Sequence, residues 1–189
     1  MSTAEPSVRS ASPLKQPRLV SESSALGAGT VLAQRYRLED PLSEGDPIQG
    51  RLWRALDTLA GDTPLVIRQV QSSESRQRFQ QIWPRLQSLL HPQLPRCGEL
   101  LESHGSLWTV RDWQEGEAYS LILSQRSERQ MVFGAGEVLL LLRQTLPLLA
   151  VINGRGLVHG DVNPRNLLRR HSDGLPVLLD FGLVQIRGE

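Results

Sequence analysis

The segment from His159 to Asn166, together with the tripeptide Asp-Phe-Gly at 180–182, constrains this chain more than any other sequence feature. It places an aspartate, Asp161, five positions before an amide, Asn166. A second aspartate, Asp180, follows the apolar run 175–179. Phosphoryl transfer from ATP uses such a set, because one carboxylate orients the acceptor hydroxyl while an amide and a second carboxylate hold Mg²⁺ on the phosphates. The order and spacing therefore predict a cleft with this chemistry.

The bulk composition narrows the class of protein. A length of 189 residues predicts one domain, or one domain with a tail. The net charge of +1 provides no overall field for nucleic acid or an anionic membrane. The single cysteine excludes an internal disulfide and is consistent with a reducing compartment. The richest apolar stretch, 138–152, contains Arg143 and Pro147 and is expected to be too short to span a bilayer. We expect a cytoplasmic chain with no nucleic-acid partner and no membrane span.

The order of the predicted elements indicates an α+β fold. Residues 1–28 are rich in Ser, Pro and Ala and are expected to be a disordered tail. Two helices are expected at 74–90 and 134–153, and Pro84 should kink or split the first. Strands are expected at 36–42, 50–55, 65–70, 98–101 and 107–113, and a final hairpin pairs 166–169 with 175–180.

From about Val31 to Gly182 the chain resembles the protein kinase superfamily. The opening 26–38 is similar to bacterial serine/threonine kinases, and the segments at 159–166 and 180–182 match the catalytic loop and the D-F-G motif. The resemblance implies a protein kinase-like fold, with a β-rich N-lobe at 29–112 and a partial, helical C-lobe at 113–189. We expect a fragment of a longer protein, or a chain that needs a partner, with an exposed apolar patch on its C-lobe.

The resemblance also implies a nucleotide site in the cleft. Ser43 replaces the first glycine of the glycine-rich loop, and the loop is two residues longer than usual, so a surface hairpin is as probable as a phosphate clamp. The hinge would offer its backbone to adenine, and each apolar residue of the site could equally be ordinary core. The expected nucleotide-binding residues are Leu42, Gly45, Gly50, Leu52, Val66, Arg68, Asp112, Trp113 and Leu168.

In the same comparison, Asp161 is the catalytic residue that positions the acceptor, and Asn166 and Asp180 are the Mg²⁺ ligands. Several positions depart from the family pattern. Arg68 stands where the phosphate-binding lysine is expected, and Ile82 stands where its glutamate partner is expected. Gly160 and Asn163 replace an arginine and a lysine of the catalytic loop, and Arg111 stands at the gatekeeper position. These changes predict inefficient transfer, because arginine is bulkier and planar where lysine is compact.

Three functional hypotheses follow. The preferred one is a serine/threonine protein kinase-like domain that binds ATP and Mg²⁺, and is a pseudokinase or a very weak phosphotransferase. The form H-G-D-x-x-P-x-N also resembles aminoglycoside and choline kinases, so a small-molecule phosphotransferase is an alternative. The third is a non-catalytic regulatory or interaction module. The expected partners are ATP and either a protein substrate or the missing C-terminal part of a longer chain.

Overall fold

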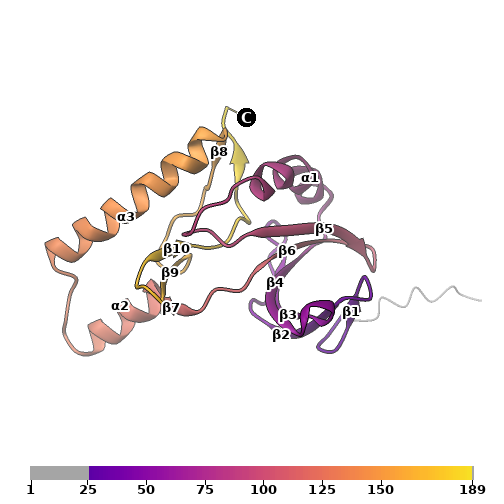
Figure 1. The fold of residues 1–189 in the computed structure, drawn as a ribbon, viewed down its shortest axis with the longest axis horizontal. Helices are drawn as coiled ribbons and strands as arrows, with labels where there is room; N and C mark the ends of the chain where they lie inside the picture. Colours follow the sequence, from indigo (N-terminus) through magenta and orange to yellow (C-terminus); the bar gives the residue numbers. More distant parts are fainter. Residues whose placement is uncertain (1–25, 189) are drawn as a thin grey trace, which may run out of the picture.

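A computed structural model describes residues 26–188 as a curled antiparallel sheet followed by a region of helices and short strands (Figure 1). The prediction of a disordered tail falls almost wholly outside the described residues. The large sheet has the strand order β1-β2-β3-β4-β6-β5. Its strands are β1 (Val31–Leu32), β2 (Tyr36–Pro41), β3 (Arg51–Asp57), β4 (Thr63–Val70), β5 (Cys97–Ser103) and β6 (Ser106–Asp112). The 3-10 turn η1 (Thr58–Ala60) links β3 to β4, and helix α1 (Ser73–Gln87) links β4 to β5.

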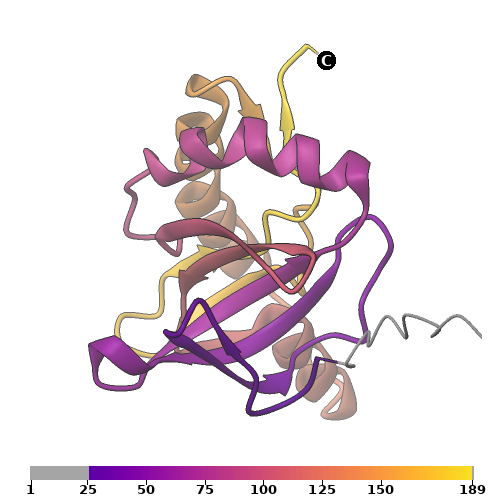
Figure 2. The same cartoon turned by 90° about the vertical axis from the view of Figure 1, so that its right-hand side faces the viewer.

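The second half of the chain carries two helices and two small sheets. The helices are α2 (Tyr119–Glu128) and α3 (Ala135–Gly154). One small sheet has the order β10-β9-β7 and the other pairs β11 with β8. The strands are β7 (Gly116–Ala118), β8 (Leu157–Val158), β9 (Leu167–Arg170), β10 (Pro176–Leu178) and β11 (Gln185–Ile186). Figure 2 shows α1 lying across the molecule beside the large sheet, close to the C-terminal strand.

Successive side chains along β3, β4 and β6 point to opposite faces of the large sheet, so the two faces carry different sets of residues. One face carries a buried cluster that includes Trp53, Ile67 and Val110, which are paired across the three strands. The opposite face carries Arg68 and Thr109, which are likewise paired. The sequence pattern therefore turns Arg68 away from the first cluster and toward the second half of the chain.

Helix α1 begins at the N-cap Ser72, whose side chain accepts a hydrogen bond from the Ser75 amide at 3.3 Å. Its buried stripe includes Phe79, Ile82, Trp83 and Leu86, and this stripe joins α1 to α3 and to the C-terminal strands in one apolar cluster. The expected split at Pro84 is wrong, because the helix continues through it. Pro84 lies on the exposed side, where water can solvate the backbone carbonyl that loses its partner.

The sequence pattern predicted the main elements but missed the smaller ones. The predicted strands, the second helix and the final hairpin are confirmed, with ends that differ by a few residues. Helix α1 ends at Gln87, earlier than the predicted 90. Helix α2 was missed because it has no apolar stripe, and only Ile122 in it is buried. Strands β1, β7, β8 and β11 were missed because two or three residues carry no periodicity.

Helix α3 lies along one edge of the molecule (Figure 1). Thr145, Leu148 and Ile152 are its buried residues, whereas most of its other apolar side chains are exposed. Its most apolar 18-residue window has a mean hydropathy of 1.6 and is 17% buried, so by length and composition alone this 20-residue helix could cross a membrane. The apolar run 138–152 forms the inner part of this longer helix, and the expected absence of a membrane span stays a prediction.

Candidate catalytic and nucleotide site

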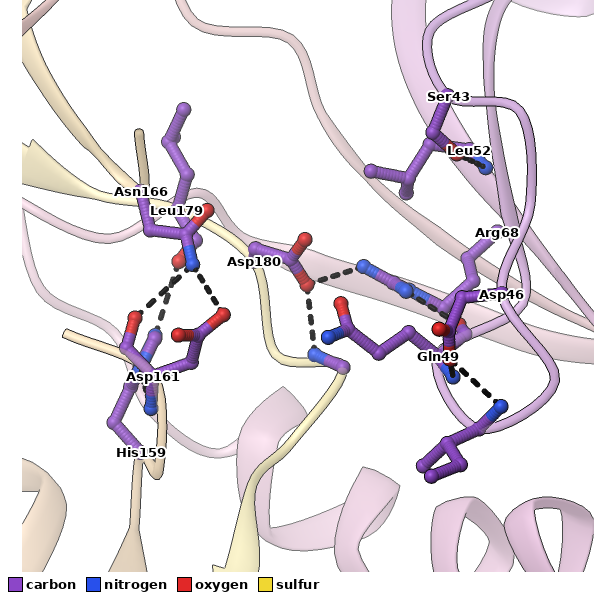
Figure 3. Close-up of polar contacts among 12 residues, drawn as sticks. Ser43, Asp46, Gln49, Leu52, Arg68, His159, Asp161, Asn166, Leu179 and Asp180 are labelled. Carbon is purple, nitrogen blue, oxygen red and sulfur yellow. Dashed lines mark hydrogen bonds and ion pairs between the residues drawn. The ribbon is translucent and has the colours of Figure 1, made fainter. Parts of the chain in front are cut away.

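The catalytic loop after β8 holds the carboxylate of Asp161 in a fixed orientation (Figure 3). One of its oxygens accepts a hydrogen bond from the amide of Asn166 at 2.8 Å, and the other accepts one from the amide of Asn163 at 2.7 Å. The Asn166 amide also donates to the Asp161 carbonyl at 3.0 Å. The five-residue spacing seen in the sequence thus brings Asp161 and Asn166 into direct contact. Asn163, considered before only as a missing lysine, contributes to this orientation.

His159 is a buried side chain that connects the catalytic loop to the segment before Asp180. It is 3% exposed, its Nε2 lies 3.0 Å from the Leu179 carbonyl oxygen, and its Nδ1 accepts a hydrogen bond from the Asp161 amide at 3.3 Å. Its ring packs edge-on against Phe181, with centroids 5.8 Å apart. Burial lowers the pKa of His159, while the Leu179 carbonyl and the nearby Asp180 and Asp161 carboxylates raise it less. The arrangement fits a structural histidine that is neutral at pH 7.

The depressed pKa of His159 predicts a pH-dependent stability. The unfolded chain takes up a proton on this side chain at a higher pH than the folded chain does, so the free energy of unfolding should fall as the pH drops below about 6.5. Chemical denaturation between pH 7.5 and 5 should show this loss in the parent chain and a smaller loss in His159→Asn. His104 is exposed in a turn, and His104→Asn should lose as much stability as the parent over this pH range. Equal pH slopes for all three chains would contradict the prediction.

Asp180 lies between the catalytic loop and the large sheet, where Arg68 reaches it from β4 (Figure 3). The two side chains form an ion pair that is almost completely buried, with 5% of the Arg68 side chain and 14% of the Asp180 side chain exposed. The same Asp180 oxygen, Oδ1, accepts a hydrogen bond from the Gly182 amide at 2.8 Å. A Cβ at position 182 would lie 2.8 Å from Arg68 Nη1, so a side chain there would have to displace the Arg68 guanidinium.

The long loop between β2 and β3 closes over Arg68. Arg68 Nη2 contacts Asp180, and the other terminal nitrogen, Nη1, donates to the carbonyl of Gln49. Asp46 turns the loop by accepting hydrogen bonds from the amides of Ile48 and Gln49, both at 2.8 Å. At the end of the loop, a Cβ on Gly50 would lie 2.0 Å from the Gln69 carbonyl oxygen, so the loop rejoins the sheet where only glycine fits.

Helix α1 offers Arg68 no carboxylate partner, because it carries Ile82 and Arg78 on the side near Arg68. Ile82 is 1% exposed and lies in the apolar cluster, so α1 presents no carboxylate at the position where the family places its glutamate. One turn earlier on α1, Arg78 donates to the Gly182 carbonyl at 2.6 Å and adds a positive charge near Arg68. Asp180 is thus the carboxylate that pairs with Arg68. The sequence analysis did not single out Arg78, although it lies four positions before Ile82 and therefore on the same side of the helix.

The expected adenine residues are only partly brought together. Leu52, Val66 and Arg68 line one small cavity with Phe181. Leu42 is 44% exposed and borders a separate, open hollow beside the glycine-rich loop. Ser43 in that loop accepts a hydrogen bond from the Leu52 amide at 3.0 Å.

The other predicted contacts lie elsewhere along the chain. Leu168 is buried in β9, and the Trp113 indole donates to Glu115 at 2.8 Å. The Asp112 amide already donates to the Arg96 carbonyl at 3.0 Å. This backbone donor of the expected hinge is therefore already used within the chain, and adenine binding by the backbone of Asp112 and Trp113 stays a prediction.

The donors that the family pattern assigns to Mg²⁺ suit that ion in part. The Asn166 amide nitrogen donates to Asp161, whereas neither the Asn166 oxygen nor the second Asp180 oxygen accepts a hydrogen bond from residues 26–188. Hard oxygen donors of this kind are what Mg²⁺ selects, with phosphates completing the shell. Within the described residues no cluster of three His, Cys, Asp or Glu side chains could hold a metal without such help.

Comparison with known proteins shows which proteins this chain is similar to. No protein-family profile matches the chain. It is 32% identical over 160 residues to the serine/threonine-protein kinase-like protein E of Synechocystis, covering 83% of this chain and 26% of that protein. It is 30% identical to the serine/threonine-protein kinase C of the same organism, covering 82% of this chain and 30% of the relative. The chain is thus similar to serine/threonine-protein kinases over about four fifths of its own length.

The solved structures agree with this kinase-like fold. The kinase domain of Mycobacterium tuberculosis PknI superposes with a TM-score of 0.65 at 24% identity, covering 84% of this chain and 64% of that one. The apo form of PpkA-294 gives a TM-score of 0.67 at 21% identity, covering 85% and 62%. The prediction of an α+β, kinase-like N-lobe with part of the C-lobe is confirmed. This kinase-like chain spans about two thirds of those domains and under a third of its first curated relatives.

Proposed function

We propose that this kinase-like domain binds ATP with Mg²⁺ weakly and transfers phosphate slowly or not at all. The observation that carries the proposal is the buried pair of Arg68 and Asp180, with Ile82 in the core. In an active site of this type, the strand cation contacts the phosphates and the aspartate is free to hold metal. Here each is occupied by the other, so nucleotide and Mg²⁺ must compete with an existing ion pair.

The residues that retain their family roles support binding. Asp161 would orient an acceptor hydroxyl, held by Asn163 and Asn166. The Asn166 and Asp180 oxygens would hold Mg²⁺, which neutralises phosphate charge when bound. The full set of proposed nucleotide contacts is Leu42, Gly45, Gly50, Leu52, Val66, Arg68, Trp113, Leu168 and the carbonyl of Asp112.

The wider functional context follows from the relatives. Their names as serine/threonine-protein kinases favour a protein substrate over a small-molecule acceptor for the ancestral reaction. The small-molecule alternative and the purely regulatory module stay predictions. We also propose a cytoplasmic location and the lobe division 29–112 and 113–189, with the remaining part of a kinase domain as the natural partner of the C-lobe.

Titration calorimetry with ATP tests the proposal. Binding should be weak, with a dissociation constant of about 0.1–1 mM, and should require Mg²⁺. Asp180→Asn keeps an oxygen that can accept from Arg68 and Gly182 but removes the charge, so it should weaken binding in Mg²⁺ about tenfold or more. Asp173→Asn removes an exposed carboxylate from the β9–β10 turn and should have no effect.

Two outcomes would contradict this function. Affinity that is unchanged by chelating Mg²⁺ would remove the metal role of Asp180 and Asn166. Efficient phosphorylation of a generic protein substrate by the parent chain would show that the Arg68–Asp180 pair does not limit transfer. Circular dichroism on each variant would establish that the substitutions left the fold intact.

A further inference from the structure

The tip of the long loop between β2 and β3, residues 46–50, is attached to the rest of the molecule by polar contacts. We call these five residues the loop tip. Asp46, Pro47 and Ile48 are exposed, and the exposed fraction of Ile48 is 58%, so the loop tip buries little apolar surface. A segment without apolar burial is held in place mainly by its hydrogen bonds, and such segments open at a low cost in free energy.

The loop tip is a closed turn that can move as one unit. The Asp46 carbonyl accepts a hydrogen bond from the Gly50 amide at 2.7 Å, and the Gly50 carbonyl accepts one from the Asp46 amide at 3.1 Å. The Asp46 carboxylate accepts two more, from the amides of Ile48 and Gln49, both at 2.8 Å. Because the turn satisfies its own amides, it should keep its shape with or without a contact to α1.

Helix α1 holds the loop tip through Ser75 and Arg78. Ser75 is 4% exposed, and its hydroxyl donates a hydrogen bond to the Ile48 carbonyl at 2.7 Å. A serine inside a helix commonly faces solvent or bonds to its own preceding turn, whereas this hydroxyl reaches a segment 27 positions away. Arg78 lies three positions later on the same side of α1, and its Nη2 is 2.6 Å from the Gly182 carbonyl oxygen and 3.5 Å from that of Ile48. None of the roles proposed for ATP or Mg²⁺ uses Ser75.

This attachment places the loop tip against the groups that would hold the phosphates of a nucleotide (Figure 3). The Gln49 carbonyl accepts from Arg68, whose other terminal nitrogen contacts Asp180. In a kinase-like site the phosphates lie between this loop and the metal-binding aspartate. Here the Arg68 side chain spans that interval, so the loop tip would have to lift before a triphosphate could enter.

We propose that the loop tip is an autoinhibitory lid, held shut against α1 by Ser75. This inference rests on the proposed ATP site and adds a control over access to it. A ligand that binds only the open form has an apparent dissociation constant equal to its intrinsic one divided by the open fraction. Loss of one hydrogen bond shifts such an equilibrium about two- to tenfold. Removing the Ser75 hydroxyl, which lies outside the proposed nucleotide contacts, should therefore strengthen ATP binding by the same factor.

A nitroxide spin label on the lid tests the contact with α1 in the absence of nucleotide. The label is attached at Ile48→Cys, where the side chain is exposed and the backbone carbonyl makes the contact, in a Cys97→Ser background. Ser75→Ala should raise the mobile fraction of the label about two- to tenfold, and Arg78→Met should also raise it. Ser73→Ala is the matched control, because Ser73 is exposed in the first turn of α1, and it should leave the spectrum unchanged.

Titration calorimetry with ATP and Mg²⁺ on the unlabelled chains provides the second measurement. Ser75→Ala should bind about two- to tenfold more tightly than the parent, and Ser73→Ala should bind like the parent. Unchanged label mobility in Ser75→Ala would overturn the lid. A more mobile label with an unchanged, measurable ATP affinity would overturn its inhibitory role. If Ser75→Ala frees the label but no chain binds ATP, the proposed function fails and the lid stands.

Discussion

Asp180→Ala is expected to lower the free energy of unfolding by about 3–5 kcal/mol, because it leaves the Arg68 guanidinium buried without its ion-pair partner. The same change removes the acceptor of the Gly182 amide at the turn after Asp180. This is a large fraction of the stability of a small domain. Urea denaturation followed by tryptophan fluorescence would measure it. An active kinase would lose its metal ligand by this change, whereas this chain should also lose stability.

The partner variant makes this prediction specific to the ion pair. Arg68→Met combined with Asp180→Ala removes both charges and should recover most of the lost stability, since a buried pair replaced by apolar groups is often neutral. Asp173→Ala is the control, because Asp173 pairs with Arg170 at the surface and its loss should change little. If the losses in the free energy of unfolding caused by Arg68→Met and by Asp180→Ala simply add in the double variant, the two side chains do not depend on each other for stability.

The exposed face of α3 is expected to make the chain self-associate. Leu139 and Leu146, seven positions apart on the helix, are 66% and 57% exposed. An apolar surface of this extent is rare on a soluble monomer. The double variant Leu139→Lys/Leu146→Lys should weaken self-association by about a hundredfold or more, since burying each leucine contributes about 1.5–3 kcal/mol. Sedimentation velocity over a range of concentrations would measure the change.

A charge-matched control separates this face from a general effect of lysine. Leu59 and Leu90 are 76% and 71% exposed, in η1 and just after α1. The variant Leu59→Lys/Leu90→Lys adds the same charge away from α3 and should associate like the parent. A parent chain that sediments as a sharp monomer, unfolds cooperatively and binds no hydrophobic dye would contradict the prediction. It would then follow that the α3 face needs no partner.

Local sequence was sufficient for the parts of the site that lie close together in the chain. The five-residue spacing of Asp161 and Asn166 spans one turn-like loop, so their contact depends on little else. The alternation of β4 determined that Arg68 leaves the buried cluster around Trp53 and faces the second half of the chain. Ile82 was predicted to be core because it falls on the apolar stripe of α1, and it is buried. In each case the spacing of residues that are close together in the sequence is enough to predict the contact or the direction of the side chain.

Only the tertiary structure decided which partners those side chains find. Arg68 and Asp180 are 112 positions apart, and no local pattern encodes that their charges meet. The use of the Asp112 amide by Arg96 depends on how β5 begins, and the closing of the loop over Arg68 depends on the Gln49 carbonyl. The small cavity lined by Arg68, Thr109 and Arg111 appears only when the sheet, α1 and Phe181 enclose it. The local sequence pattern determines to which side of its strand or helix a side chain points. Long-range packing determines how deeply that side chain is buried and which charges lie near it.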